Sequence, residues 1–458
     1  MASFTSLSFL FRFIPIFMAV YFLAPAKVKN IVLLAGSIVF YAVGEPLYIF
    51  LLIALVLFNY LFMRLLYGSK GPGRYSENAK KRRLYMIIAV SVNILVLMTA
   101  KILNWTQDNF LLPIGLSFYI FKMISFQADV YKKEIPIRPG FIETATYFMA
   151  FPQIAQGPIM RYEDGCFYND KRCTIKNIED GLKYFILGLS MKVLLADRIG
   201  ILWNDIGMYG FDSVSSTLAW MGAFAYSAEL YFDFFGYSLM ASGIMLAMGF
   251  DFIENFDNPY ASKTISEFYR RWHMTLGNFF RDYVYIPLGG NREGKLRTVL
   301  NLAFVWFLTG LWHGNGFNFI IWGLVLGAFI ILEKLFYGKK LARSKVLGHI
   351  YVLVVIPVTW CIFAIGDLKA LGVYLVKLIP FVSDLGNPNV NPLDFVDYIK
   401  DYWYLFLIAA VLMVPAVTGL YEKIKKKWFV NVLLVVLFML SVYFCASASS
   451  NPFMYLKF

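Results

Sequence analysis

The feature that most constrains this chain is a long succession of apolar runs. Most approach the ~20 residues that an α-helix needs to cross a bilayer. They lie roughly at residues 8–24, 30–44, 47–67, 85–100, 112–131, 141–157, 183–203, 216–238, 298–312, 317–335, 347–366, 402–420 and 428–447. The runs do not alternate apolar and polar residues, which favours helices over the strands of a barrel. The sequence therefore predicts an all-α polytopic membrane protein, with roughly 11 transmembrane helices plus re-entrant and interfacial helices.

The composition excludes an ordinary soluble protein. Of the 458 residues, 59% are hydrophobic and only 16% are charged, against about 25% charged residues in soluble proteins. A chain with so few charged residues has too little polar surface to cover a soluble core. Most of the chain must therefore face lipid. The three histidines and four cysteines show no metal-ligand spacing, and we expect no metal site.

The net charge of +13 does not indicate a nucleic-acid partner, because the basic residues lie in short loops between apolar runs. The basic segments 68–84, 336–346 and 421–427 are expected in the cytoplasm by the positive-inside rule. The acidic stretches 204–215 and 381–401 suit the outside. Alternation then predicts a multi-pass protein of the plasma membrane with both termini extracytoplasmic.

We expect one integral-membrane domain over residues 1–458, since the sequence shows no internal repeat and no soluble domain. The lack of a repeat also argues against an inverted-repeat transporter. The one long polar stretch, about 251–297, is predicted to be a cytoplasmic amphipathic or re-entrant region.

Within that stretch, Thr264-Ile-Ser-Glu267 is a capping-box pattern that predicts a helix over 264–283. Polar residues spaced three, four and four apart would share one face of it: Arg270, His273, Gly277 and Arg281. Two guanidinium groups beside an imidazole make a cradle for a phosphate-bearing ligand. The alternative is an amphipathic helix lying on the membrane, with its arginines on lipid headgroups.

A second candidate site follows the apolar run 298–311, which at ~1.5 Å per residue is about 21 Å long and too short to cross. The run leads into Trp312-His313-Gly314-Asn315-Gly316, and a second run, 317–335, returns to a basic segment. This pattern predicts a bent hairpin with His313 deep in the bilayer. An ionisable side chain at that depth indicates a functional site, unless hydrogen bonds between helices simply satisfy the histidine.

Other polar residues fall inside apolar runs. Glu229 and Asp233 share a helix face, and Lys192 and Lys122 are also within predicted spans. Such charges either pair as a structural network or line a wet cavity. The segment Pro152-Gln153-Ile154-Ala155-Gln156-Gly157-Pro158 predicts a broken helix that lines a cavity.

Several of these segments together resemble one known family. They are Leu112–Tyr119, Tyr231–Ser238, Glu254–Tyr260, Arg270-Arg271-Trp272-His273, Phe280–Gly290 and Leu308–Gly314. The chain is similar to the membrane-bound O-acyltransferase (MBOAT) family, in its alginate O-acetyltransferase branch, which also includes teichoic-acid D-alanylation proteins.

The resemblance implies a helical bundle around a central tunnel that joins a cytoplasmic donor to an outside acceptor. It implies that His313 is the essential catalytic residue and His273 a second one. The donor would be acetyl-CoA or another acyl carrier thioester, with no permanently bound cofactor. Its phosphates would be held at Arg270, Arg271, Gly277 and Arg281.

The same resemblance gives the remaining residues supporting or tunnel-lining roles. These are Trp312, Asn315, Asp233, Gln153 and Gln156. The acceptor would be a hydroxyl of an extracytoplasmic polysaccharide or of a partner acetyltransferase, and membrane lipids would surround the protein.

Three alternatives stay open. The chain could transfer D-alanine from a carrier protein to teichoic acid. It could also be a transporter or flippase of acyl or polysaccharide units, or a non-catalytic scaffold for a polysaccharide synthase.

Overall fold

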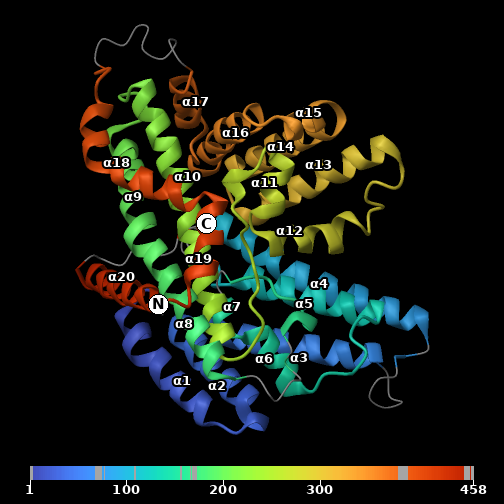
Figure 1. Cartoon of the computed structure of the whole chain (residues 1–458). Helices are drawn as coiled ribbons and strands as arrows, with labels where there is room; N and C mark the ends of the chain where they lie inside the picture. Colours follow the sequence, from blue (N-terminus) through green and yellow to red (C-terminus); the bar gives the residue numbers. More distant parts are fainter. Residues whose placement is uncertain are drawn as a thin grey trace. The chain divides into compact units, whose positions relative to one another are not determined.

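The computed structural model describes residues 4–67, 75–76, 78–107, 110–154, 157–165, 167, 173–379, 390–447 and 454. Within these ranges every regular element is a helix and no strand occurs (Figure 1). The prediction of an all-α protein is therefore confirmed. Backbone contacts divide the chain into two compact units. The prediction of a single domain over 1–458 stays a prediction.

The first unit comprises the described residues of 1–188, 237–254 and 445–456. Its elements are η1 (Phe9–Phe13), α1 (Ile14–Leu23), η2 (Ala26–Val28), α2 (Lys29–Gly44), α3 (Tyr48–Tyr67), α4 (Ala79–Thr106), α5 (Leu116–Lys132), α6 (Phe141–Met149), α7 (Phe151–Ile154), η3 (Glu163–Gly165) and most of α8 (Ile175–Ser190). Buried amides join three of these helices, since Asn59 and Asn93 exchange side-chain hydrogen bonds of 3.1 and 2.8 Å and Gln127 donates to the Asn59 carbonyl. Such bonds hold helices together where the surroundings are apolar.

The run 141–157 is broken, as predicted, but the break lies at Ala150, before the segment 152–158 that predicted it, and the cavity stays a prediction. Helix α6 ends at Met149, Ala150 leaves the helical conformation, and the short α7 follows. The side-chain oxygen of Gln153 accepts a hydrogen bond of 3.1 Å from Lys122, whose ammonium also lies 4.6 Å from the centre of the Tyr147 ring. Gln156 lies outside the described residues.

The second unit comprises the described residues of 189–236 and 255–444. Its elements are η4 (Met191–Ala196), α9 (Asp197–Tyr209), most of α10 (Ser216–Ala247), η5 (Pro259–Ala261), α11 (Ile265–Arg271), α12 (Met274–Phe280), η6 (Arg281–Tyr285), α13 (Gly294–His313), α14 (Phe317–Leu332), η7 (Glu333–Tyr337), α15 (Gly338–Arg343), α16 (Leu347–Ala364), α17 (Leu368–Lys377), α18 (Phe395–Leu412), α19 (Pro415–Ile424) and α20 (Trp428–Ser447). Residues 237–247 of α10 and 445–447 of α20 belong to the first unit.

Seven described helices are long and apolar enough to cross a membrane, and an eighth is added if α18 and α19 form one span bent by 74°. The polytopic class is therefore confirmed with fewer such helices than the predicted number. The difference arises because several apolar runs do not form one continuous apolar helix. The run 141–157 is broken at Ala150, and α13 begins in the polar segment that contains Lys295 and Arg297.

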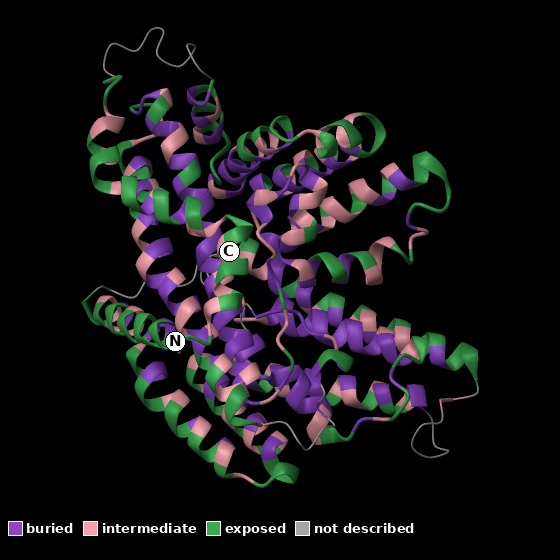
Figure 2. Ribbon diagram, in the orientation of Figure 1, coloured by how far each residue is buried: buried purple, intermediate pink, exposed green. Residues whose placement is uncertain are grey.

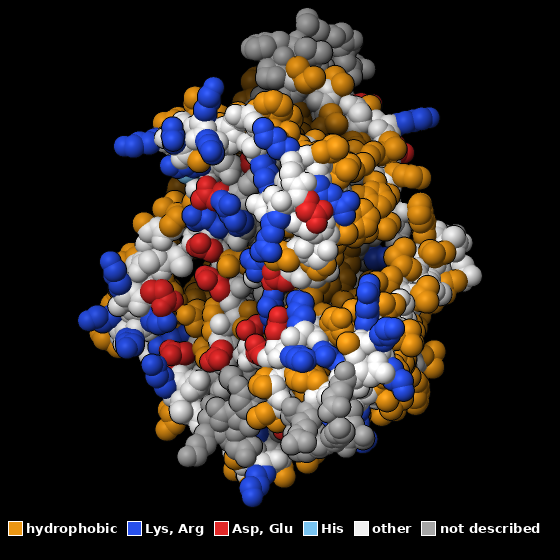
Figure 3. Space-filling view, turned by 90° about the vertical axis from the view of Figure 1, so that its right-hand side faces the viewer, with side chains coloured by type: hydrophobic (Ala, Val, Ile, Leu, Met, Phe, Trp, Pro, Cys, Tyr) orange, Lys and Arg blue, Asp and Glu red, His pale blue; other side chains and the backbone are white. Residues whose placement is uncertain are grey.

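Burial separates helices that face the protein interior from helices that face outward (Figure 2). Of the most apolar window of α10, 89% is buried, against 17% for α20. Large hydrophobic side chains form broad areas on the face drawn in Figure 3. An apolar surface of this extent is expected where a protein contacts lipid instead of water.

Candidate active site

The centre of the candidate site is a hairpin formed by α13 and α14, joined by residues 314–316. Glycines allow the two backbones to touch. A Cβ atom at Gly310 would lie 2.5 Å from the Phe319 carbonyl oxygen, and one at Gly323 would lie 2.4 Å from that of Trp306. Position 310 of α13 faces position 319 of α14, and position 306 faces position 323. The numbering thus falls along one helix as it rises along the other, so the two helices are antiparallel. The predicted hairpin is formed, and His313 is the last residue of its first helix, which has 20 residues instead of the 14 of the apolar run. The position of His313 deep in the bilayer stays a prediction.

The hydrogen bond of His313 defines the chemistry of its ring. Its Nδ1 lies 2.7 Å from the carbonyl oxygen of Thr309. A carbonyl only accepts hydrogen bonds, so Nδ1 carries the hydrogen. The neutral ring then has its lone pair on Nε2, and Nε2 is the atom that can take a proton from a substrate.

Aromatic side chains from three helices surround His313. The ring centre of Trp312 is 4.6 Å from that of His313, Trp322 of α14 is at 4.8 Å, and Phe363 of α16 is at 5.5 Å. The imidazole is buried, with 8% of its surface exposed. The Trp322 indole N–H is also buried and has no hydrogen-bond partner among the described residues. This aromatic enclosure keeps bulk water from the ring.

The second predicted histidine lies at a break between two helices, which corrects the predicted single helix over 264–283. Helix α11 ends at Arg271, Trp272 is extended, and His273 has a φ of +45° before α12 begins. A positive φ is strained for a residue with a side chain, so the surroundings must hold it. The N-terminal part of the prediction is confirmed, because the Thr264 hydroxyl accepts from the Glu267 backbone N–H at 3.0 Å.

Asn255 is the residue that holds this break. Its carbonyl oxygen accepts a hydrogen bond from the Met274 N–H at 2.9 Å, and its side-chain oxygen accepts from the Thr275 hydroxyl at 2.9 Å. The same side-chain oxygen lies 3.1 Å from Nδ1 of His273. Since that oxygen accepts, Nδ1 of His273 carries the hydrogen, and the lone pair of this ring is also on Nε2.

The two histidines come together across Trp312. The ring centre of Trp312 is 6.4 Å from that of His273 and 4.6 Å from that of His313. The Phe234 ring of α10 packs against the His273 ring, with the two ring centres 4.6 Å apart. Burial holds the pKa of His273 well below its ordinary value, and the nearby His313 lowers it further. His273 is therefore neutral at neutral pH.

The predicted cradle of arginines on one helix face is not formed, because the break at His273 separates the stripe. His273 points into the protein, whereas Arg270, Gly277 and Arg281 are exposed. Arg281 forms an ion pair of 2.7 Å with its neighbour Asp282. A Cβ atom at Gly277 would meet the Tyr269 carbonyl oxygen at 3.6 Å, an ordinary contact, so no described group requires a glycine there.

Arg271 is the half-buried member of the set. Its guanidinium lies 2.9 Å from Glu267 and 3.7 Å from Asp257. These ion pairs join α11 to the segment that precedes it. Arg271 thus has two acidic partners within the protein. Its part in donor binding stays a prediction.

The predicted supporting residues lie in different settings. Asp233 forms a buried ion pair of 2.5 Å with Lys192, which also pairs with Asp197 at 2.7 Å, as the structural alternative for these charges predicted. Asn315 is half-buried in the turn after His313. Gln153 belongs to the first unit, and its role as a tunnel residue stays a prediction.

Two residues of the site escaped the sequence analysis. Asn255 lies in a segment that carried the family resemblance, but nothing in the spacing revealed its contact with His273. Glu333 lies within the apolar run 317–335, and the sequence predicted no role for it. Its buried carboxylate accepts from the backbone N–H groups of Ile265 and Ser266 at 2.6 and 2.9 Å, and so caps α11. Glu333 and Ile265 are 68 residues apart in the sequence, so no local pattern indicates this cap.

Comparison with known proteins identifies the family of this chain. Residues 33–376 match the model of the MBOAT, membrane-bound O-acyltransferase family. The chain is 35% identical over 405 residues to a probable alginate O-acetylase AlgI of Pseudomonas fluorescens, covering 87% of this chain and 81% of the relative. It is 31% identical to the peptidoglycan O-acetyltransferase of Helicobacter pylori, over 79% and 77% of the two chains. It is also 30% identical to the teichoic acid D-alanyltransferase of Streptococcus thermophilus, over 53% and 61%.

The chain therefore belongs to the membrane-bound O-acyltransferase family and is a multi-pass membrane enzyme, an acyltransferase. The predictions of family, fold class and enzyme class are confirmed.

Proposed function

We propose that this enzyme transfers an acetyl group from cytoplasmic acetyl-CoA to a hydroxyl of an extracytoplasmic polysaccharide, or to a partner acetyltransferase that completes the transfer. The observation that carries the proposal is His313, a buried imidazole with its lone pair on Nε2 and a second neutral histidine nearby. Two relatives named as O-acetylating enzymes cover most of the chain, which supports acetyl as the group transferred.

In the proposed reaction His313 acts as general base. Its Nε2 takes the proton of the acceptor hydroxyl as the hydroxyl oxygen attacks the thioester carbonyl carbon. The carbon–sulfur bond then breaks, and the proton passes from His313 to the leaving sulfur, so that the free thiol and the acetyl ester are the products. No net proton is consumed, and the imidazole returns to its starting form.

His273 has a separate proposed role in the same pocket. Because its Nδ1 hydrogen is directed to Asn255 and the ring stays neutral, its Nε2 can accept a hydrogen bond from a substrate group without competing as a cation. It would orient the acceptor hydroxyl toward His313. The supporting positions Trp312 and Asn315 would shape the pocket around both substrates.

The donor phosphates are proposed to bind the exposed guanidinium groups of Arg270 at the end of α11 and Arg281 at the start of η6, with Arg271 as a further candidate. Acetyl-CoA is multiply anionic, so it stays on the cytoplasmic side while only the small acetyl group reaches His313. The plasma membrane as location, both termini outside and a tunnel through the protein belong to this proposal.

D-Alanyl transfer is the rival within the same family. The D-alanyltransferase relative covers 53% of this chain, whereas the alginate O-acetylase relative covers 87%. This difference favours acetyl transfer. Transport without chemistry is not supported, because the family consists of acyltransferases.

The test is acetyl transfer from labelled acetyl-CoA by the full chain reconstituted in vesicles, with an acetyl-free polysaccharide as acceptor. His313→Ala should lower the rate about 10²- to 10⁴-fold, the usual contribution of a general base. The matched control is His349→Ala, because His349 stands at the start of α16, 14 positions or about 21 Å from Phe363 in the pocket. Undiminished transfer by folded His313→Ala protein would overturn the mechanism. Transfer from a D-alanyl carrier thioester but not from acetyl-CoA would replace the donor.

A further inference from the structure

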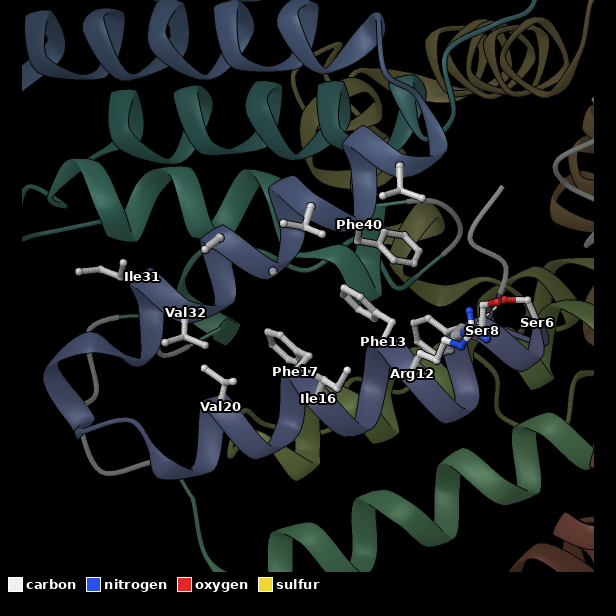
Figure 4. Close-up of a pocket in the computed structure, with 15 residues that line it drawn as sticks. Ser6, Ser8, Arg12, Phe13, Ile16, Phe17, Val20, Ile31, Val32 and Phe40 are labelled. Carbon is white, nitrogen blue, oxygen red and sulfur yellow. Dashed lines mark hydrogen bonds between the residues drawn. The ribbon is translucent and has the colours of Figure 1, made fainter.

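A groove in the first unit uses none of the residues of the proposed reaction. It lies between η1–α1 and α2 and has a volume of about 780 Å³ (Figure 4). Pockets that bind small ligands are typically about 300–1,000 Å³, so this groove has the size of a ligand site. Its lining is almost wholly apolar, with polar side chains only at one end.

The polar end carries the single charge of the lining. Arg12 of η1 lies there with the hydroxyl-bearing residues Ser6 and Ser8, as Figure 4 shows. The Arg12 side chain is exposed, and among the described residues none forms an ion pair with it. A guanidinium beside two serines at the mouth of an apolar groove is complementary to a phosphate group.

The floor of the groove is closed by aromatic packing. Phe13, Phe17 and Phe40 lie side by side along it, with ring centres of Phe13 at 5.9 Å from Phe17 and 5.4 Å from Phe40. Gly36 lets α2 approach α1, because a Cβ atom there would lie 2.5 Å from the Phe17 ring. The outer walls stay open, since Ile16 is 65% exposed. The cavity is therefore a channel along the two helices, open on one side.

The dimensions fit one hydrocarbon chain. From Ser6 to Val20 the lining extends over 14 residue steps, about 20 Å at ~1.5 Å per residue. One leaflet is about 15 Å of hydrocarbon, half of the ~30 Å core. A transmembrane helix of another protein is about 10–12 Å wide with its side chains. An apolar helix of this kind would not pair with the charge of Arg12 at one end of the groove, so it is a poorer match than a lipid.

We propose that this groove binds an anionic phospholipid, with one acyl chain along α1 and α2 and the phosphate held by Arg12, Ser6 and Ser8. The charge selects the headgroup and the apolar lining holds the chain. Binding of this kind would fix the position of α1 against α2 independently of the acyl-transfer reaction. The proposal does not rest on the proposed function.

The test is native mass spectrometry of the full chain in detergent, titrated with phosphatidylglycerol or with phosphatidylcholine of the same acyl chains. No acyl donor is present, so the result is independent of catalysis. The unaltered protein should retain phosphatidylglycerol about fivefold better, the preference that one basic residue near a membrane surface contributes. Arg12→Gln should abolish that preference. The matched control Arg64→Gln, which removes an exposed arginine of α3 outside the groove, should keep it.

A second pair of variants tests the apolar part. Ala35 lines the groove and is exposed, whereas Ala54 of α3 is exposed outside it. Ala35→Phe should lower retention of both lipids severalfold by filling the channel, and Ala54→Phe should not. Equal behaviour of Arg12→Gln and Arg64→Gln, or of the two alanine variants, would overturn the proposal. Dimers that replace bound lipid and disappear in Ala35→Phe would overturn it as well, in favour of a second copy of the chain.

Discussion

Two sets of polar side chains in the second unit are buried away from water, and their polar atoms are stabilised in opposite ways. Lys192 is charged and pairs with Asp233 and Asp197 at 2.5 and 2.7 Å. The histidines 273 and 313 bond through Nδ1 to neutral oxygens of Asn255 and Thr309. In the first set one ammonium is shared by two carboxylates, which ties the residues that carry them to one another. In the second, one nitrogen of each ring is anchored and the other has a lone pair.

The comparison teaches how to separate structural from chemical polar groups in an apolar interior. A buried ion pair is costly to break, because removing one partner leaves a bare charge. Removing a neutral imidazole leaves no bare charge, and the buried oxygen that loses its hydrogen-bond partner costs about 1–3 kcal/mol. The predictions below test that difference, beginning with the largest effect.

Lys192→Met should destabilise the protein by about 3–5 kcal/mol, because it removes the cation 2.5 Å from the buried Asp233 carboxylate. Thermal unfolding followed by tryptophan fluorescence in detergent measures the loss. The double variant Lys192→Met with Asp233→Leu should recover most of it, since the only carboxylate then left without the lysine is that of Asp197, whose side chain is 23% exposed. If the single and double variants unfold alike, the pair does not hold the helices as described.

Asn255→Ala should slow acyl transfer about 100-fold, the typical cost of displacing a reacting group by about 1 Å, because His273 loses the contact that sets its ring. Asn255→Asp is the discriminating variant. It keeps the acceptor oxygen, but its negative charge raises the pKa of His273, so the acidic limb of the pH–rate profile should move to higher pH. A positioning role is contradicted if Asn255→Asp has the unaltered profile, or if Asn255→Ala reacts at the normal rate.

The depressed pKa of His273 makes stability depend on pH. Below the ordinary histidine pKa of 6.5, the unfolded chain binds a proton at this position that the folded protein does not. Stability should therefore fall as pH drops from 6.5, at up to about 1.4 kcal/mol per pH unit. Melting temperatures of the unaltered protein and of His273→Gln measure the slope. The slope should be smaller in His273→Gln, and equal slopes would show that His273 is protonated in the folded state.

Glu333→Ala should have the smallest effect, about 0.5–2 kcal/mol, the range measured for lost helix caps. Its carboxylate accepts from the N–H groups that open α11, so its loss should loosen the helix that leads to His273. Glu333→Gln keeps an acceptor oxygen and is the control. Hydrogen exchange over residues 265–271 gives a local readout, and unchanged exchange in Glu333→Ala would contradict the cap.

Much of the fold could be predicted because apolar length and glycine spacing act locally. The hairpin around His313 followed from a short apolar run, three nearby glycines and a polar turn. Close approach at Gly310 is visible in the sequence, since a glycine in an apolar helix has few other uses. The capping function of Thr264 was equally local and equally predictable.

The sequence by itself determined the membrane class, the hairpin and the two histidines as candidates, because each depends on residues close together in the chain. Only the tertiary structure decided the break at His273, the pairing of Arg271 with Asp257 and the cap from Glu333. Each depends on a partner brought in by folding. A helical stripe through Arg270, His273 and Arg281 satisfies every local rule, yet the bonds to Asn255 stabilise a positive φ that local rules disfavour. Contacts between distant residues override local periodicity at that point, and there the second histidine turns inward.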